Sequence, residues 1–135
     1  MRNPIKLALV AAALAAPASL PSLAHATDTT ELKAKLQASM QRSVERRLVD
    51  GALLSLDFET GETTQLYPVE AHPMILAMGD HFVLCSDLKA LDGTSKTVDY
   101  YMAKNGNRYS IFRTEIDNRA PLKALMKAGK AHHLE

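Results

Sequence analysis

The twelve residues from Met74 to Cys85, MILAMGDHFVLC, decide the fold. Two apolar runs flank Gly79-Asp80, and a two-residue turn with Gly first is typical of a tight antiparallel hairpin. Such a turn fixes three cross-strand pairs: Met78 with His81, Leu76 with Val83, and Met74 with Cys85. Because both faces of this hairpin are apolar, we expect it to lie centrally in a sheet and to be covered on both sides.

Further strands are predicted on either side of this hairpin. Downstream, Asn105-Gly106 joins strands over 97–103 and 108–114, with Met102 opposite Tyr109 and Tyr100 opposite Ile111. Upstream, alternating apolar residues predict a half-buried strand over 52–58, and residues 63–69 predict a second strand, which Pro68 places at an edge. We expect connections at 71–73 and 86–96.

Helices are predicted at both ends of this run of strands. Residues 28–49 carry an apolar stripe at four-residue spacing, with Asp28 as the cap and Gly51 as the stop. A shorter helix follows Asp117-Asn118 and ends near Gly129, and we expect residues 130–135 to be frayed. The fold class is therefore α+β: a single antiparallel sheet of about five to six strands, a meander of hairpins, flanked by an N-terminal and a C-terminal helix.

The first 26 residues have the order of a secretory signal peptide. A start with two basic residues precedes an apolar run over 7–16, and Ala24-His25-Ala26 supplies small residues for cleavage. We therefore expect a cleaved signal over 1–26, a single small domain over 27–135, and a location in the periplasm or outside the cell. The apolar run is shorter than the roughly 20 residues that span a bilayer. No Cys follows it to carry a lipid, so we expect no stable membrane anchor.

Composition excludes several classes of protein. The chain has 135 residues and a formal net charge of +1, which gives no electrostatic reason to expect nucleic acid as a partner. One Cys excludes an intrachain disulfide framework and a multi-Cys zinc site. The Gly-x-Ser-x-Gly elbow, the phosphate-binding Gly loop and His-Glu-x-x-His do not occur. We therefore expect a protein that is not an enzyme and has no cofactor.

One set of residues suggests soft-metal chemistry as an alternative. Imidazole, thioether and thiolate are ligands suited to copper, and His72, Met74 and Cys85 lie at one end of the central hairpin. The Met78–His81 pair is roughly 13 Å away at 3.3 Å per residue and cannot share the same ion. The competing interpretation, which we favour, is that Met74 and Cys85 fill an apolar face.

Two further pairs are candidate binding residues. Tyr101 and Phe112 fall on the outer face of the second hairpin, where they form an aromatic patch unless Leu122 and Met126 of the last helix cover it. Arg42 and Arg46 lie one turn apart on the first helix and could meet an acidic partner or lipid head groups. A solvated helix face is the alternative for the arginines.

These observations favour a small exported, non-enzymatic periplasmic binding or accessory protein. We expect its partner to be another protein, held on a sheet face or at a sheet edge. A periplasmic copper-binding protein is the first alternative, and a small hydrolase or sugar-binding protein is the second. The sequence leaves monomer or dimer open, because a lone Cys in an oxidising compartment can pair between chains.

Overall fold

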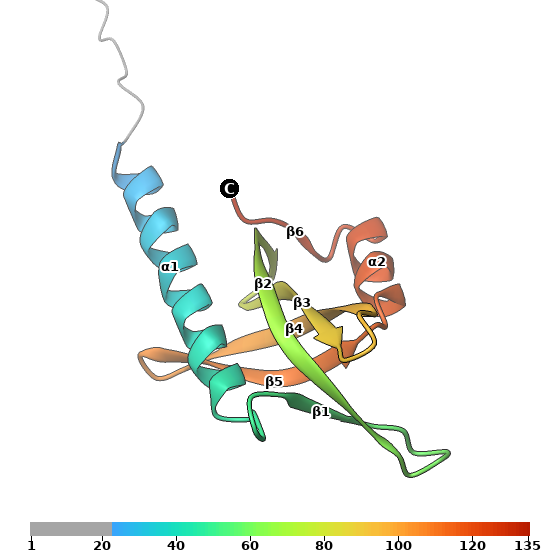
Figure 1. Cartoon of the computed structure of the whole chain (residues 1–135). Coiled ribbons are helices and arrows are strands. Elements are labelled where there is room, and N and C mark those ends of the chain that lie inside the picture. Colours follow the sequence, from blue (N-terminus) through green and yellow to red (C-terminus); the bar gives the residue numbers. More distant parts are fainter. Residues whose placement is uncertain (1–22) are drawn as a thin grey trace, which may run out of the picture.

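The computed structural model describes residues 23–135, with side chains from Asp28 onward. The predicted signal peptide therefore lies almost entirely outside the described residues. Two helices flank one antiparallel sheet, as Figure 1 shows, and the predicted α+β fold is confirmed. The elements are α1 (Leu23–Glu45), β1 (Leu53–Leu56), β2 (Thr63–Met78), β3 (His81–Ala90), β4 (Ser95–Asn105), β5 (Arg108–Ile116), α2 (Ala120–Lys127) and β6 (His132–His133). Within residues 23–135, no helix is long and apolar enough to cross a membrane.

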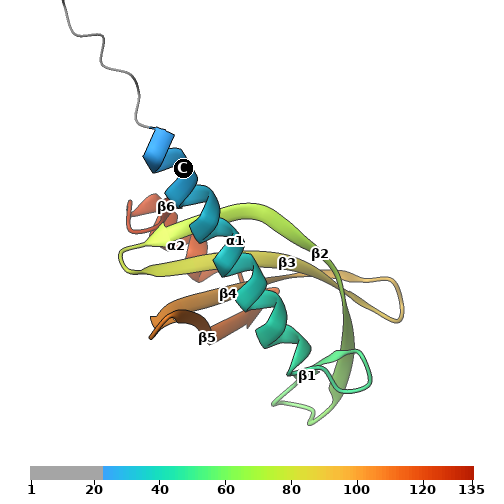
Figure 2. The same cartoon turned by 90° about the vertical axis from the view of Figure 1, so that its left-hand side faces the viewer.

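The sheet is a meander in which each strand pairs with its neighbour in the chain, in the order β1-β2-β3-β4-β5. The short β6 pairs with the far end of β2, on the same edge as β1. In Figure 2 α1 crosses in front of the sheet, and α2 lies behind it. The sheet is thus covered by one helix on each face, and the predicted meander is confirmed.

Each face of the sheet carries its own apolar core. The face under α1 combines Leu36, Met40 and Val44 of the helix with residues of the five strands β1 to β5. Its sheet residues are Leu53, Leu66, Ile75, Leu84, Leu88, Val98, Tyr100, Met102 and Ile111. The face under α2 is smaller and consists of Leu76, Val83, Cys85, Tyr101, Leu122 and Ala131. Both faces of the central hairpin are therefore buried, as its two-sided apolar pattern predicts.

The central hairpin follows the predicted register only near its turn. Met78 pairs with His81 and Leu76 pairs with Val83, but the ladder is interrupted between Ala71 and Ile75, so Met74 is not paired with Cys85. The predicted connection at 71–73 is also wrong, because β2 continues through it as a 16-residue strand. Pro73 cannot donate a ladder hydrogen bond, and a bulge accommodates it without ending the strand.

The second hairpin turns one residue later than predicted. Asn105 pairs with Arg108, so Gly106 and Asn107 form the turn, with Gly106 at φ 60°. Met102 therefore lies opposite Ile111 and not opposite Tyr109, and an irregularity follows between Tyr101 and Met102. Near the turn each residue of β4 thus pairs with a residue of β5 two positions later than predicted. Because a shift of two residues keeps every side chain on its own face, the predicted core face of this hairpin is preserved.

Both ends of the described chain differ from the prediction. The helix α1 spans Leu23–Glu45, so Asp28 lies inside it and is not its cap. A tight bridge between Val49 and Ala52 then replaces the last predicted turn, with Asp50 at φ 50°. At the other end, residues 130–135 are not frayed, because β6 pairs with Leu76 and Ala77 and the Leu134 amide donates to the Ile75 carbonyl at 2.9 Å.

Candidate functional site

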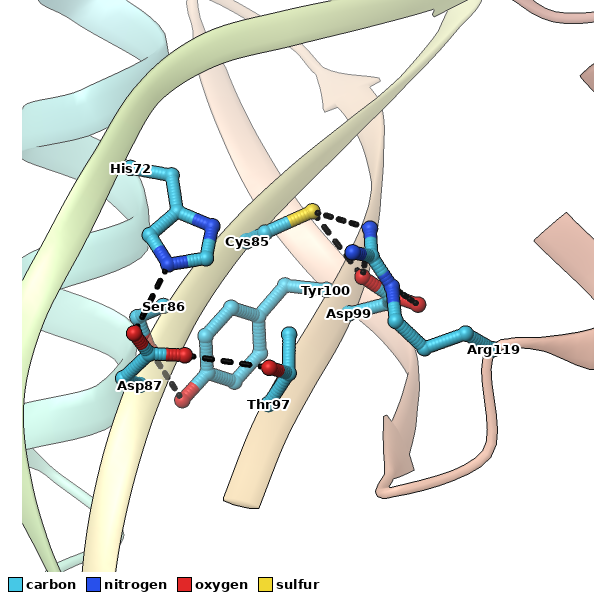
Figure 3. Close-up of polar contacts among 8 residues, drawn as sticks. All are labelled: His72, Cys85, Ser86, Asp87, Thr97, Asp99, Tyr100 and Arg119. Carbon is cyan, nitrogen blue, oxygen red and sulfur yellow. Dashed lines mark hydrogen bonds and ion pairs between the residues drawn. The ribbon is translucent and has the colours of Figure 1, made fainter. Parts of the chain in front are cut away.

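A buried polar cluster lies under the start of α2, and Figure 3 shows its members. The Cys85 thiol contacts Asp99 Oδ1 at 2.9 Å, across the β3–β4 pair. Arg119, immediately before α2, donates from Nε to Asp99 Oδ2 at 3.2 Å and from a terminal nitrogen to Cys85 Sγ at 3.4 Å. We call Cys85, Asp99 and Arg119 the buried triad; it ties the start of α2 to the middle of the sheet.

The charges of the buried triad determine its chemistry. Asp99 is fully buried, and the Arg119 guanidinium contacts both of its carboxylate oxygens. Burial raises the pKa of Cys85 to about 12, and its hydrogen bond to the Asp99 carboxylate acts in the same direction. The thiol is therefore protonated at neutral pH and donates to Asp99. A protonated, buried thiol is a poor nucleophile and a poor metal ligand, so the triad fits a structural anchor.

A second polar group lies beside the triad. His72 Nε2 is 3.0 Å from Asp87 Oδ2, and the Thr97 hydroxyl donates to Asp87 Oδ1 at 3.0 Å. The hydrogen bond from His72 holds the pKa of Asp87 below its usual range, with a smaller contribution from Thr97. This group joins the irregular part of β2 to β3 and β4.

The structure does not bring the three copper candidates to one point. In Figure 3 the His72 ring points to Asp87, whereas Cys85 Sγ points to Asp99 and Arg119. Met74 is 40% exposed and lies in the interrupted part of β2. Among residues 23–135, no group of three His, Cys, Asp or Glu side chains is placed to hold a metal ion. The copper alternative stays a prediction.

The predicted aromatic patch is largely closed. Leu122 and Leu125 of α2 pack on the face that carries Tyr101, so Tyr101 keeps only 4% exposure and is not available as a contact residue. Its buried hydroxyl has no hydrogen-bond partner among the described residues. Phe112 remains 55% exposed beside the rings of Tyr101 and His81. Of the predicted pair, only Phe112 is accessible.

The two predicted arginines are both exposed on α1. Each guanidinium donates to the serine three residues earlier: Arg42 to Ser39 Oγ and Arg46 to Ser43 Oγ, both at 3.3 Å. They lie beside the β4–β5 hairpin, where they line a groove with Arg108. The helical spacing indicated that the arginines share a face, but their juxtaposition with Arg108 depends on the tertiary fold.

An exposed apolar surface at the β1 end of the sheet was missed by sequence reasoning. Three of its members, Val49, Leu54 and Leu91, line a shallow depression of about 570 Å³. The surface, which we call the apolar corner, consists of five side chains that are 42–92% exposed: Val49, Leu54, Leu56, Phe58 and Leu91.

The strand pairing explains why these side chains are exposed. Leu53 faces the core under α1, so Leu54 and Leu56 must face away from it, beside Gln65 and Thr63 of β2. The alternation of Ala52, Leu54, Leu56 and Phe58 predicted one buried face, but consecutive Ala52 and Leu53 are the buried residues. The sequence did contain an indication of this surface, because apolar residues lie at both odd and even positions of the short strand and therefore on both of its faces.

Comparisons with models of protein families, with curated proteins and with solved structures found no match for this chain. A function for this chain must therefore be inferred from the geometry of the described residues.

Proposed function

We propose that this chain is a small exported, non-enzymatic binding or accessory protein that holds a partner protein against the apolar corner. The observation that carries the proposal is the exposure of five large apolar side chains at one end of the sheet. Several large apolar side chains exposed at one end of a small folded domain commonly mark a protein contact. Phe58, at 92% exposure, is the most prominent of the five.

The edge of the sheet at this corner supports the same proposal. β1 is a terminal strand of the described sheet, and its sequence, Leu-Leu-Ser-Leu, contains no charge and no proline. Edge strands usually carry charges, proline or bulges that prevent pairing with other chains. The opposite terminal strand, β5, has such protection in Arg108, Arg113 and the irregularity beside Phe112. An extended segment of a partner can therefore add to β1 while it buries Leu54 and Leu56.

The polar clusters favour binding over catalysis. The Cys85 thiol is protonated and engaged with Asp99, and His72 is engaged with Asp87. A nucleophile or general base needs a free reactive atom within reach of a substrate. The depression at the apolar corner is lined by apolar and hydroxyl side chains with Gln65 and Asp92, which suits a protein surface.

Site-specific photocrosslinking in cells of the source organism tests this proposal. A photoreactive residue at Leu54 or Phe58 should give a discrete crosslinked product with a second protein. The matched control is Met126, an exposed apolar residue on α2, which should give none.

Three results would count against the proposal. The first is crosslinking at Met126 or Phe112 in place of the corner. The second is a product whose mass equals two copies of this chain, which would make the corner a self-association surface. The third is no product at any position together with substrate turnover by the purified protein.

A further inference from the structure

A second groove, which we call the arginine groove, lies between α1 and the β4–β5 hairpin. Its volume is about 180 Å³. It is lined by Ser39, Arg42, Ser43, Arg46, Asn105, Arg108, Tyr109 and Ser110. The four α1 residues recur at spacings of three and four and so share one side of the helix, and the hairpin provides the opposite wall. No residue is common to this groove and the apolar corner, so the two surfaces can be tested separately.

The positive charge of this groove is not neutralised by the described residues. No Asp or Glu lines it, and Arg42, Arg46 and Arg108 form no ion pair within residues 23–135. Other arginines of the same domain are paired: Arg113 with Glu115, and Arg119 with Asp99.

Two acids lie in adjoining grooves, and Glu31 shares its groove with Arg42 and Arg108. Glu45 on α1 lines a separate groove beside β2, and Glu31, at the neighbouring end of the hairpin, is paired with Lys35. Three guanidiniums around one small polar space repel one another, and an anion placed between them removes that repulsion.

Hydroxyl groups add donors to the same space. Ser39 Oγ and Ser43 Oγ accept from Arg42 and Arg46, and Ser110 Oγ accepts from the Asn105 amide at 3.4 Å. Since each serine oxygen acts here as an acceptor, its own hydrogen can be directed into the groove. The serines also hold the two α1 guanidiniums beside the helix, which reduces the entropy lost when a ligand binds.

We infer that the arginine groove binds a tetrahedral oxyanion of the phosphate class. Such an anion presents several oxygens and up to two charges to guanidiniums whose fork geometry matches them. A volume of about 180 Å³ is below the roughly 300–1,000 Å³ of sites that enclose a whole organic ligand, so the ligand group is small. The oxyanion is either inorganic phosphate or the phosphomonoester head group of a lipid at the groove mouth.

An NMR titration of the protein purified from cells that express the whole chain tests this inference. Sodium phosphate, at constant ionic strength adjusted with sodium chloride, should shift the amide signals of Ser39, Ser43 and Ser110 to saturation. Arg46→Gln or Arg108→Gln should raise the Kd for phosphate at least tenfold. Arg113→Gln, an exposed arginine outside the groove, is the matched control and should leave the Kd unchanged.

A vesicle experiment separates the two sources of the oxyanion. Phosphatidylcholine vesicles that contain phosphatidic acid are compared with vesicles that contain phosphatidylglycerol, and binding is measured by sedimentation. Binding to phosphatidic acid vesicles alone, lost in Arg46→Gln and retained in Arg113→Gln, assigns the lipid as the source. Saturable binding of inorganic phosphate assigns the free anion.

Three results would overturn the inference. The first is that chloride produces the same shifts as phosphate. The second is that Arg113→Gln weakens binding as much as Arg46→Gln does. The third is that neither phosphate nor phosphatidic acid vesicles bind. Circular dichroism of each variant, with an unchanged spectrum, confirms that the comparison is made between folded proteins.

Discussion

Replacing Arg119 with Met removes the guanidinium that pairs with the buried carboxylate of Asp99. The variant leaves a charge inside the fold, between the sheet and the start of α2, with the Cys85 thiol as its remaining partner in the triad. Removing one partner of a fully buried pair costs about 3–5 kcal/mol. The Arg119 side chain keeps 34% exposure, so water reaches the vacated position, and we expect a loss of about 2–3 kcal/mol in the free energy of unfolding.

Urea denaturation followed by circular dichroism measures this loss. A domain of this size has a urea slope of about 1–3 kcal/mol per molar, so the midpoint should fall by about 0.7–3 M. The matched control is Arg113→Met, because Arg113 is 62% exposed and its pair with Glu115 lies at the surface. A surface pair contributes about 0–1 kcal/mol, so this control should change the midpoint little.

A second variant separates the charge effect from the packing effect. In Asp99→Asn the buried group is neutral, so adding Arg119→Met to that background should cost less than about 1 kcal/mol. The reasoning is refuted if Arg119→Met costs the same in both backgrounds. It is also refuted if Arg119→Met is no more destabilising than Arg113→Met. In either case the triad would not anchor α2 through its charges.

Further predictions concern Cys85, Asp87 and the C-terminal tail. Because burial raises the pKa of Cys85 to about 12, iodoacetamide should alkylate the native protein at pH 8 far more slowly than the urea-unfolded protein, and equal rates contradict the assignment. The raised pKa also predicts constant stability below about pH 8 and a loss as the pH rises from about 9, the value of a free thiol, towards 12, which urea midpoints across pH would show. The pKa of Asp87 is lowered chiefly by His72, so the stabilising effect of the Asp87 carboxylate is lost as the pH falls below 3.8, the ordinary pKa of an aspartate. In His72→Phe the pKa of Asp87, followed by NMR, should rise, and an unchanged value refutes the contact. Truncation after Gly129 removes β6 and the Leu134–Ile75 hydrogen bond and should lower stability by about 1–3 kcal/mol, at roughly 0.5–1.5 kcal/mol per bond; an unchanged urea midpoint would mean that the tail contributes nothing.

The sequence predicts those parts of the fold that local chemistry determines. Gly79-Asp80 fixes the turn of the central hairpin, and the two-sided apolar pattern of its strands requires cover on both faces. The α+β class and the meander follow from that hairpin and from the helical stripe of α1. Register beyond the turn is not local: Pro73 and His72 resemble a connection, yet β2 passes through them because β3 pairs with it on either side of the interruption.

The candidate sites depend on contacts between distant segments, and the sequence indicates them only in part. Asp99 lies in an apolar stretch of β4, which signals a buried carboxylate that needs a partner, but nothing local identifies Arg119 twenty residues later. Arg42 and Arg46 are predicted from helical spacing, whereas Arg108 joins them through the fold. The apolar corner was missed because the alternation from Ala52 to Phe58 is typical of a buried strand face. Only the pairing of β1 with β2 shows that Leu54 and Leu56 face outward.

The central claim is that the apolar corner is the contact surface for a partner protein. Its most direct test is the affinity of the crosslinked partner for the wild-type chain and for Leu54→Lys, with Met126→Lys as the control for an equal change on α2. Burial of one Leu side chain is worth about 1.5–3 kcal/mol, and each 1.4 kcal/mol is a factor of ten. We expect Leu54→Lys to weaken binding by about tenfold to a hundredfold and Met126→Lys to leave it unchanged. Equal affinity for Leu54→Lys and the wild-type chain would contradict the claim.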